Sequence, residues 1–446
     1  MHLRARRILG WAFIASFLLI APAIIFSTAG YRYNFGKRRI ERTGVMVLES
    51  RPQGASIFLN GVLRKETTPA HLSGLLPGTY DVRVEKPGYH AWEKNVPIES
   101  RSTSFVTQIG LFRQTLPTLY SPMSKPIRPA FSPDGRYGAA MTETSSGSEL
   151  AIIDLKTGKA VLPYRSSAEA ETFRLSWSQD GNWLLIAHEE KKPSFLLWGA
   201  RSPEHVRDLR TDHAALALEH ADWEKGASRL HGQAGGTMYA IVPETLEATP
   251  EGPSIDEAIV ADGDVYGIQA GPPARLARRK LKADTFEPIA ELPSAAFHPF
   301  PDSDGHVAYA SPAGNDFFVV DPSGDRPKAF ETRGKGAAWS SDGTKLLYWS
   351  DFEVRIRDTK SGSDDLITRL SEPIGSSAWH HPESGVIYAT GSGLSAAEAS
   401  DRYGRLTVPL ATFTVIEKFA IDATGDTAYV FGEKEGRTGL WKLRLK

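Results

Sequence analysis

The sequence predicts an all-β protein with one N-terminal transmembrane helix, a small antiparallel β-domain and a larger set of repeated β-sheets. Three observations support this: an uncharged apolar run near the N-terminus, a stretch of short β-rich segments broken by glycine and proline, and a motif that recurs along the remaining chain. The chain has 446 residues, of which 41% are hydrophobic and 24% charged, so it is long enough for two or more structural units of ordinary globular composition.

Charge balance and cysteine content exclude several classes of site. The formal net charge is −1 at pH 7, and this near-neutral balance gives no reason to expect nucleic acid, whose binding calls for a clustered basic footprint. The chain has no cysteine, so disulfides, thiolate metal ligands and a cysteine nucleophile are excluded. We therefore expect no nucleic-acid partner.

The first segment has the composition of a membrane span. Arg4, Arg6 and Arg7 precede residues 8–31, which contain no charged side chain. A helix of these 24 residues would be about 36 Å long, because each residue adds 1.5 Å, and this length crosses a bilayer. The run also lacks a polar face that could contact water, which disfavours a helix of a globular core. We therefore predict that residues 8–31 contact the membrane.

Residues 1–30 are accordingly assigned as a membrane anchor or signal segment. Pro22 lies within the run, and transmembrane helices tolerate proline. A cleavable signal peptide is the alternative, because Ser27-Thr28-Ala29 places small residues where a signal peptidase reads. The apolar run is long for a signal peptide, so an uncleaved anchor is favoured.

Basic residues follow the apolar run as well as precede it. Counting them by the positive-inside rule places the bulk of the chain in the cytoplasm. A short basic tail, an apolar run and one large remainder are instead typical of export signals and signal anchors. We predict that the part of the chain after the apolar run is extracytoplasmic, in the periplasm or at the cell surface. The alternative is that this part faces the cytoplasm. Residues 31–44 are predicted to be a basic juxtamembrane linker that is solvated or lies against lipid headgroups.

The next segment, residues 45–112, is predicted to be a compact antiparallel β-domain. Runs such as "VMVLES", "ASIFLNG" and "TYDVRVEK" are separated by glycine- and proline-containing turns. In the last run Tyr80, Val82 and Val84 share one face, because side chains of a strand alternate.

This segment resembles the PEGA domain, which is named after a Pro-Glu-Gly-Ala signature. "SRPQGASIFLNG", "TTP" and "LPGTYDVRVEKPGYHAW" follow the family pattern in order, with glutamine at position 53 in place of glutamate. The resemblance implies a small β-module common in bacterial envelope and surface proteins, without catalytic residues. Tyr80, Tyr89 and Trp92 are candidates for a binding surface; the alternative is that these aromatic side chains pack in the core or in turns.

A repeated motif covers the remaining residues, 113–446. It is spelled "FSPDGRYGAAM" from Phe131, "WSQDGNWLLIA" from Trp177 and "WSSDGTKLLYW" from Trp339. Periods near 40 residues with β-rich content predict a β-propeller, in which each repeat is one four-stranded blade. The first residue of each copy gives eight marks: Phe131, Trp177, Trp223, Ile259, Phe297, Trp339, Trp379 and Phe419. Eight blades are therefore predicted, or seven if the weak copy at Ile259 merges with its neighbour.

The Asp-Gly pairs are predicted to be structural turn residues between the first two strands of a blade, because glycine adopts the left-handed conformation that such turns need. The predicted turn residues are Asp134, Gly135, Asp180, Gly181, Asp262, Gly263, Asp342 and Gly343. In form the motif resembles the repeat of TolB-like propellers of bacterial envelope proteins. The last repeat lacks an outer strand, and "FRQTLPTLY" at residues 112–120 is predicted to supply it and close the ring.

No motif for chemistry is found. There is no P-loop and no nucleophile elbow. His188 with Glu189 and Glu190, and the pair His380-His381, do not follow metalloprotease spacing. Two Asp-rich stretches, Asp262 with Asp264 and Asp302 with Asp304, lack the remaining ligands of a calcium loop. No catalytic, cofactor-binding or metal-binding residue is therefore predicted.

The organisation favours a non-catalytic, membrane-anchored envelope protein. Its propeller would be a binding or scaffold module for an envelope protein or a glycan, since loops at strand ends converge on a rigid base. The alternatives are an enzyme acting on glycans at the propeller channel, as a hydrolase or lyase, and a cytoplasmic-facing membrane sensor.

Overall fold

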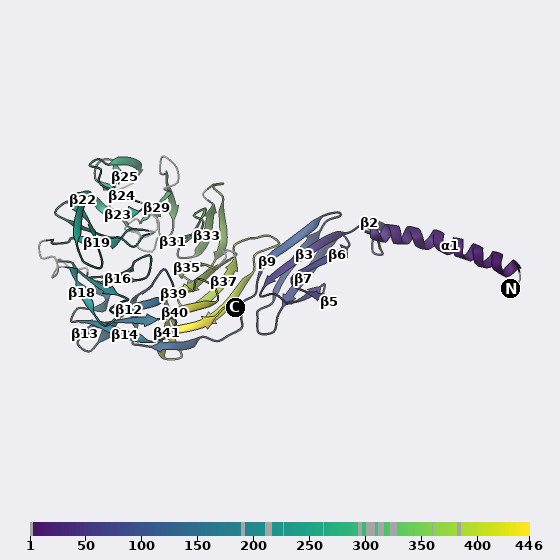
Figure 1. Cartoon of the computed structure of the whole chain (residues 1–446), viewed down its shortest axis with the longest axis horizontal. Helices are drawn as coiled ribbons and strands as arrows, with labels where there is room; N and C mark the ends of the chain where they lie inside the picture. Colours follow the sequence, from purple (N-terminus) through teal and green to yellow (C-terminus); the bar gives the residue numbers. More distant parts are fainter. Residues whose placement is uncertain are drawn as a thin grey trace. The chain divides into compact units, whose positions relative to one another are not determined.

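The computed structural model describes residues 3–188, 192–209, 216–225, 227–261, 263–292, 297–299, 308–310, 316–321, 328–358, 360–380 and 385–446. The chain forms two compact units (Figure 1). The first contains Met1–Gln114 and Ser400–Leu406, and the second contains Thr115–Ala399 and Thr407–Leu445.

The first unit begins with helix α1 (Leu3–Thr28), which contains Pro22. Its segment Leu9–Phe26 is long and apolar enough to cross a membrane, and none of this segment is buried within the protein. The helix is therefore a candidate membrane span. The residues predicted to be a basic juxtamembrane linker contain a hairpin, in which β1 (Tyr31–Asn34) pairs with β2 (Arg39–Arg42).

Seven strands follow in the first unit and form two sheets. The strands are β3 (Gly44–Arg51), β4 (Ser56–Leu59), β5 (Val62–Thr67), β6 (Ala70–Leu75), β7 (Gly78–Glu85), β8 (Trp92–Ile98) and β9 (Thr103–Gly110). The sheet orders are β6-β3-β9 and β5-β4-β7-β8. The alternation in β7 buries Val82 and Val84 completely, as the sequence pattern predicts. Tyr403 and Leu406, from the distant segment of this unit, pack against the same core.

One strand pair corrects the expectation of a purely antiparallel unit. β3 and β9 run parallel, with Val45 opposite Thr103 and Leu48 opposite Val106. These are the first and last of the seven strands that form the two sheets, and the intervening strands provide the long crossover that parallel neighbours need. Turn residues in the sequence indicate hairpins between consecutive strands. They do not indicate that two strands far apart in the chain pair in parallel.

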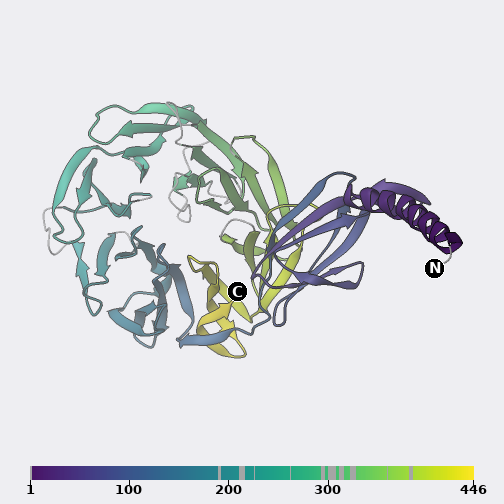
Figure 2. The ribbon, with the colours of Figure 1, turned by 45° about the vertical axis from the view of Figure 1, so that its right-hand side comes forward.

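The second unit is a β-propeller of eight four-stranded antiparallel sheets, counted over the described residues (Figure 2). Four blades are β11–β14 (Pro126–Phe131, Tyr137–Thr144, Gly147–Asp154, Ala160–Ser166), β15–β18 (Phe173–Trp177, Trp183–His188, Ser194–Gly199, Val206–Asp208), β19–β22 (His220–Trp223, Leu230–Ala234, Thr237–Ile241, Ala248–Pro253) and β23–β26 (Asp256–Ala261, Asp264–Gln269, Ala274–Lys280, Glu287–Leu292). Three more are β27–β30 (His298–Pro299, Ala308–Ala310, Asp316–Asp321, Lys328–Arg333), β31–β34 (Gly336–Trp339, Lys345–Trp349, Glu353–Asp358, Asp364–Arg369) and β35–β38 (Ile374–His380, Gly385–Thr390, Gly393–Glu398, Thr407–Thr412).

The eighth blade confirms the predicted ring closure. It combines β39 (Val415–Ile421), β40 (Thr427–Lys434) and β41 (Arg437–Arg444) with β10 (Thr118–Pro122) from the start of the unit. β10 pairs with β41, with Thr118 opposite Lys442. The Ile259 repeat has its own sheet, β23–β26, so the propeller has eight blades and not seven.

In six blades the repeated aromatic residue lies near the end of the first strand: Phe131, Trp177, Trp223, Trp339, Trp379 and Phe419. Two of these tryptophans bond to the preceding blade: the indole N–H of Trp223 donates to the carbonyl of Ser176 at 2.9 Å, and that of Trp379 to the carbonyl of Ala338 at 3.0 Å. The apolar run after each turn lies between two blades. In β16, Leu184 and Ile186 pack in the core toward the preceding blade, whereas Leu185 and Ala187 pack toward the next blade.

Candidate functional site

The Asp-Gly turns are built by hydrogen bonds within each turn. Ser132 Oγ donates to Asp134 Oδ1 at 2.7 Å, and the backbone N–H of Arg136 donates to the same carboxylate oxygen at 3.1 Å. Gly135 has φ +70° and donates its N–H to the carbonyl of Ser132 at 2.9 Å. The carboxylate of Asp134 is thus part of the turn itself.

The same geometry recurs in two other blades. Ser178 Oγ donates to Asp180 at 2.6 Å, and Ser340 Oγ donates to Asp342 at 2.7 Å. Gly181, Gly263 and Gly343 have φ of +64°, +77° and +68°, in the left-handed region that favours glycine. Asp262 lies outside the described residues. The serine two positions before each aspartate was missed in the sequence, although its recurrence in all three motif copies was a usable signal.

Turns of neighbouring blades are also bonded to one another. Arg136 donates to the carbonyl of Asp180 and to the side-chain oxygen of Asn182, both at 2.8 Å. Gly263 N–H donates to Glu224 Oε1 at 3.1 Å, and His380 Nε2 lies 3.0 Å from the carbonyl of Gly425. Since all blades share one strand order, these turns lie on one face of the ring, and their polar groups bond mainly to each other.

The Asp342 turn predicts a specific dependence of stability on pH. Hydrogen bonds from the Thr344 N–H and the Ser340 hydroxyl lower the pKa of Asp342 to about 2. A carboxyl with a depressed folded-state pKa stabilises the fold above its unfolded value of about 3.9, and this contribution is lost as the pH falls toward 2. We therefore expect the denaturation midpoint of Asp342→Asn to fall less steeply between about pH 4 and pH 2 than that of the wild type. Parallel profiles over this range would contradict the assignment.

A polar cluster lies on the inner strands of the second and third blades. Arg174 on β15 pairs with Asp222 on β19, with 3.4 Å between Nη1 and Oδ2. Ser176 Oγ donates to Asp222 Oδ1 at 2.9 Å. The side chains of Arg174 and Asp222 are 32% and 41% exposed, so they stay accessible at the inner edge of the ring.

Partial removal of the Asp222 carboxyl from water opposes its ionisation and would by itself raise its pKa. The charges of Arg174 and Lys225 and the hydrogen bonds from Trp223 N–H and Ser176 outweigh this effect and hold that pKa below its ordinary value. Asp222 is therefore ionised at neutral pH. It can accept hydrogen bonds or pair with a cation, but it is a poor proton donor.

Two inner strands begin with bulges that contain a charged residue with positive φ. The register of β11 shifts between Ile127 and Ala130, and Arg128 there has φ +50°. In β23 a bulge holds Glu257 with φ +53°. Residues other than glycine rarely adopt this conformation, and bulges commonly re-aim side chains near binding sites. Sequence reasoning missed Arg128, Arg174, Asp222 and Glu257; their shared position shortly before the repeated aromatic residue was the available signal.

A second polar cluster lies in the interior of the third and fourth blades, β19–β22 and β23–β26. His231 is 4% exposed, with Nε2 3.4 Å from Glu224 and Nδ1 3.1 Å from Glu251. Arg279, which is 2% exposed, donates to the carbonyls of Glu251 and Pro253. The contact between His231 Nδ1 and Glu251 Oε2 lacks hydrogen-bond geometry, whereas Arg279 bonds two adjacent sheets together. We assign this buried cluster to the stability of the ring.

The three aromatic candidates of the first unit are not brought together as one exposed surface. Trp92 is 2% exposed in the core. Tyr80 and Tyr89 are partly buried against that core; the Tyr80 hydroxyl donates to the carbonyl of Leu76 at 3.0 Å, and the guanidinium of Arg113 lies 5.1 Å from the Tyr89 ring centre.

The other polar motifs do not converge on one site. His188 stacks on Phe173 with 4.6 Å between ring centres, and Asp264 pairs with Arg278 at 3.5 Å. Of the residues in these motifs, Glu189, Glu190, Asp302, Asp304 and His381 lie outside the described part of the chain, as Asp262 does. Within the described part, no three His, Asp or Glu side chains are grouped so that they could hold a metal ion.

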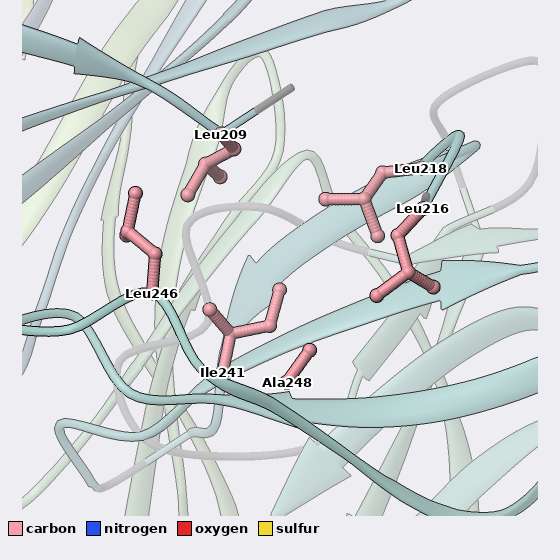
Figure 3. A pocket seen from close by; sticks show the side chains of 6 residues that line it. All are labelled: Leu209, Leu216, Leu218, Ile241, Leu246 and Ala248. Carbon is pink, nitrogen blue, oxygen red and sulfur yellow. The ribbon is translucent and has the colours of Figure 1, made fainter. Parts of the chain in front are cut away.

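A small cavity lies where the second blade, β15–β18, meets the third, β19–β22 (Figure 3). It measures about 10 Å³, close to the volume that one water needs. Its lining is entirely aliphatic and consists of Leu209, Leu216, Leu218, Ile241, Leu246 and Ala248. Without a polar group to orient a ligand, this cavity is a packing void.

Comparisons with solved structures return β-propellers at low sequence identity. The C-terminal WD40 domain of Sif2 is 14% identical, with a TM-score of 0.48, and the match covers 74% of this chain and 98% of that one. Dihydro-heme d1 dehydrogenase NirN matches with 14% identity and a TM-score of 0.44 over 71% of this chain and 70% of its own. Oligogalacturonate lyase in complex with manganese matches with 13% identity and a TM-score of 0.41 over 73% and 99%.

No curated protein matched the chain. The family model of the PEGA domain matches residues 43–109, the segment that forms the two sheets of the first unit. The chain thus contains a PEGA domain preceded by a candidate membrane span and followed by an eight-bladed β-propeller.

Proposed function

We propose that this chain is a non-catalytic, membrane-anchored envelope protein whose propeller binds an envelope protein or a glycan. A PEGA domain joined to a β-propeller supports a binding or scaffold role. PEGA domains are generally extracellular, which supports a body on the extracytoplasmic side of the membrane. The binding face in this proposal is the one on which the inner strands begin.

The distribution of polar bonds favours this face over the opposite one. The Asp-Gly turns lie at the far ends of the inner strands, and Asp134, Asp180 and Asp342 are bonded within their own turns. If a ligand displaced one of these carboxylates, the N–H and O–H groups that donate to it within the turn would lose their partner. Each unpaired donor costs about 1–3 kcal/mol. A partner therefore gains more at the starts of the inner strands.

The observation that carries the proposal is the polar inner edge formed by Arg174 and Asp222, with Arg128 and Glu257 in the bulges. A half-exposed ion pair with a nearby hydroxyl offers donors and acceptors in fixed positions, which suits sugar hydroxyls and polar peptide groups. The left-handed backbone of Arg128 and Glu257 is strained, and such strain commonly accompanies a binding role.

The charge state of Asp222 favours binding over glycan cleavage. Hydrolysis of a glycosidic bond uses one carboxylic acid with a raised pKa as proton donor and a second carboxylate about 5–9.5 Å away. The pKa of Asp222 is lowered because the charge of Arg174 and the hydrogen bonds to its carboxylate outweigh burial. A carboxylate of this kind is suited to accept hydrogen bonds from a ligand.

A crosslinking capture tests the site and the side of the membrane together. A membrane-impermeant crosslinker is applied to spheroplasts that carry the full chain, and crosslinked species are purified through a C-terminal tag. We expect Asp222→Ala and Arg174→Met to lower the captured amount about tenfold, which corresponds to about 1.4 kcal/mol of binding free energy. Glu149→Ala is the matched control, because Glu149 pairs with Arg165 on β13 and β14 of the outer part of a blade.

Three results would contradict the proposal. Equal losses for Asp222→Ala and Glu149→Ala would place the partner elsewhere. Capture only with a membrane-permeant crosslinker would place the body in the cytoplasm. Release of soluble sugar fragments from envelope glycans by the wild-type protein, and not by Asp222→Ala, would show an enzyme. Thermal unfolding of each variant separates loss of the site from loss of the fold.

A further inference from the structure

The hairpin formed by β1 and β2 has one apolar face. Tyr33 lies directly opposite Ile40, and side chains two positions apart on a strand share a face, so Tyr31 lies on this face as well. At its end next to the helix, Arg42 lies opposite Tyr31, with its guanidinium 4.7 Å from the ring centre. Phe35 follows in the turn. Tyr33, Ile40 and Phe35 are 48%, 56% and 84% exposed, which is unusual for large apolar side chains so close in sequence.

The opposite face of the hairpin is polar and tied to the first unit. Buried Glu41 accepts a hydrogen bond from Asn34 Nδ2 at 2.7 Å and pairs with Arg39 Nη2 at 2.6 Å. Arg32 lies on this face too, and a side chain placed at Gly74 of β6 would come within 2.9 Å of its guanidinium. The polar face thus contacts the sheet of the PEGA domain, and the apolar face points away from that contact.

The hairpin continues directly from the candidate membrane span. Phe26 of α1 packs edge-on against Tyr31, with 5.4 Å between ring centres. The backbone N–H and the hydroxyl of Thr43 donate to the carbonyl of Gly30 at 2.8 and 2.9 Å, which holds the start of the hairpin against its end. Its position at the end of the apolar helix is therefore set by contacts within the first unit.

The hairpin is also strongly basic. Residues 31–42 contain five basic side chains and one acidic side chain, a net charge of +4 in a chain whose total is −1. The basic residues are Arg32, Lys37, Arg38, Arg39 and Arg42. Lys37, Arg38 and Arg39 are exposed around the turn, beside Phe35.

We propose that this hairpin is a second membrane contact, in which Tyr33, Phe35 and Ile40 enter the interfacial region and the basic turn binds anionic lipid headgroups. Aromatic rings flanked by arginine and lysine are typical of membrane–water interfaces, and polybasic segments beside a span are attracted to anionic lipid. Lipid is the expected partner of this face for two reasons: the hairpin follows directly on the apolar helix, and its turn is positively charged. The contact fixes the PEGA domain close to the bilayer, in addition to the tether that the helix provides.

The absence of cysteine allows one site to be labelled at a time. The full-length Phe35→Cys chain is labelled with an environment-sensitive NBD fluorophore and reconstituted in vesicles that contain a lipid-borne doxyl quencher. Val62→Cys is the matched control, because Val62 is also apolar, 64% exposed and at a hairpin turn of the same unit. We expect at least threefold stronger doxyl quenching at position 35 than at position 62, and a further increase when phosphatidylglycerol replaces phosphatidylcholine.

A second variant tests the charge separately from the apolar contact. Arg38→Glu in the Phe35→Cys background is expected to abolish the response to phosphatidylglycerol, whereas Arg38→Lys is expected to retain it. Equal doxyl quenching at positions 35 and 62 would overturn the proposal. So would protection of position 35 from acrylamide without doxyl quenching, because a protein surface or a second copy would then cover this face.

Discussion

Replacing Gly439 with alanine is expected to lower the free energy of unfolding of the propeller by about 3 kcal/mol, because it displaces the strand that closes the ring. Gly439 lies in β41 with φ +154°, and a Cβ there would overlap the carbonyl oxygen of Ser121 in β10 and approach Leu119 to 3.0 Å. β10 is held in the last blade by its pairing with β41, so this strain acts directly on the closure. Denaturant unfolding of the full chain measures the loss.

The matched control is Gly436→Ala in the turn before the same strand. Gly436 has φ +71°, but a Cβ at this position meets no atom within 4 Å. Only backbone strain is added there, so we expect a loss of about 1 kcal/mol. Limited proteolysis gives an independent measurement, since release of β10 exposes residues 115–122. Equal losses at the two glycines, without faster cleavage, would contradict the closure role of this pair.

Replacing Arg279 with alanine is expected to cost about 3–5 kcal/mol, because it removes the hydrogen bonds of a buried guanidinium to two carbonyls and leaves a cavity in their place. Its guanidinium donates to the carbonyl of Pro253 through two nitrogens at 3.0 and 2.6 Å, and to that of Glu251 at 3.3 Å. These carbonyls belong to β22, whereas Arg279 is in β25 of the next blade. The side chain therefore joins two neighbouring sheets, and its loss is measured as a lower unfolding midpoint.

Arg278→Ala is the control for Arg279, because adjacent residues of a strand point to opposite faces. Arg278 is 19% exposed and makes longer ion pairs, to Asp264 at 3.5 Å and Glu287 at 3.8 Å. We expect its loss to cost at most about 1 kcal/mol. Arg279→Met separates volume from hydrogen bonding; if methionine restored wild-type stability, the bonds to the carbonyls would not be the cause.

The propeller was predictable because each repeat contains, within a short stretch of sequence, the residues that form its own blade. The aromatic residue, the Asp-Gly pair and the apolar run after it are each explained by one blade, so Phe131, Trp177 and Trp339 identify equivalent positions without knowledge of the ring. Closure was predictable for a similar reason, since the last repeat is one strand short and the segment at residues 112–120 had no blade.

Features that depend on two distant segments were missed. The parallel pairing of β3 with β9, the ion pair of Arg174 with Asp222 and the buried bonds of Arg279 each join elements that no short window of sequence contains. The basic charge of residues 31–42 predicted a linker and not a hairpin. The apolar face of this hairpin exists only because strand pairing places Tyr33 opposite Ile40.

By itself, the sequence determined the order of parts: an apolar N-terminal segment, a PEGA-like β-domain and a propeller with glycine-containing turns. These follow from local composition and periodicity, which depend on side-chain chemistry and backbone conformation within a few residues. Only the tertiary structure decided which charged side chains meet, such as Arg174 with Asp222, and which stay exposed at the inner edge. The reason is that an ion pair or a binding surface depends on the packing of separate blades, and this packing sets the distances and the exposure of groups that are far apart in the chain.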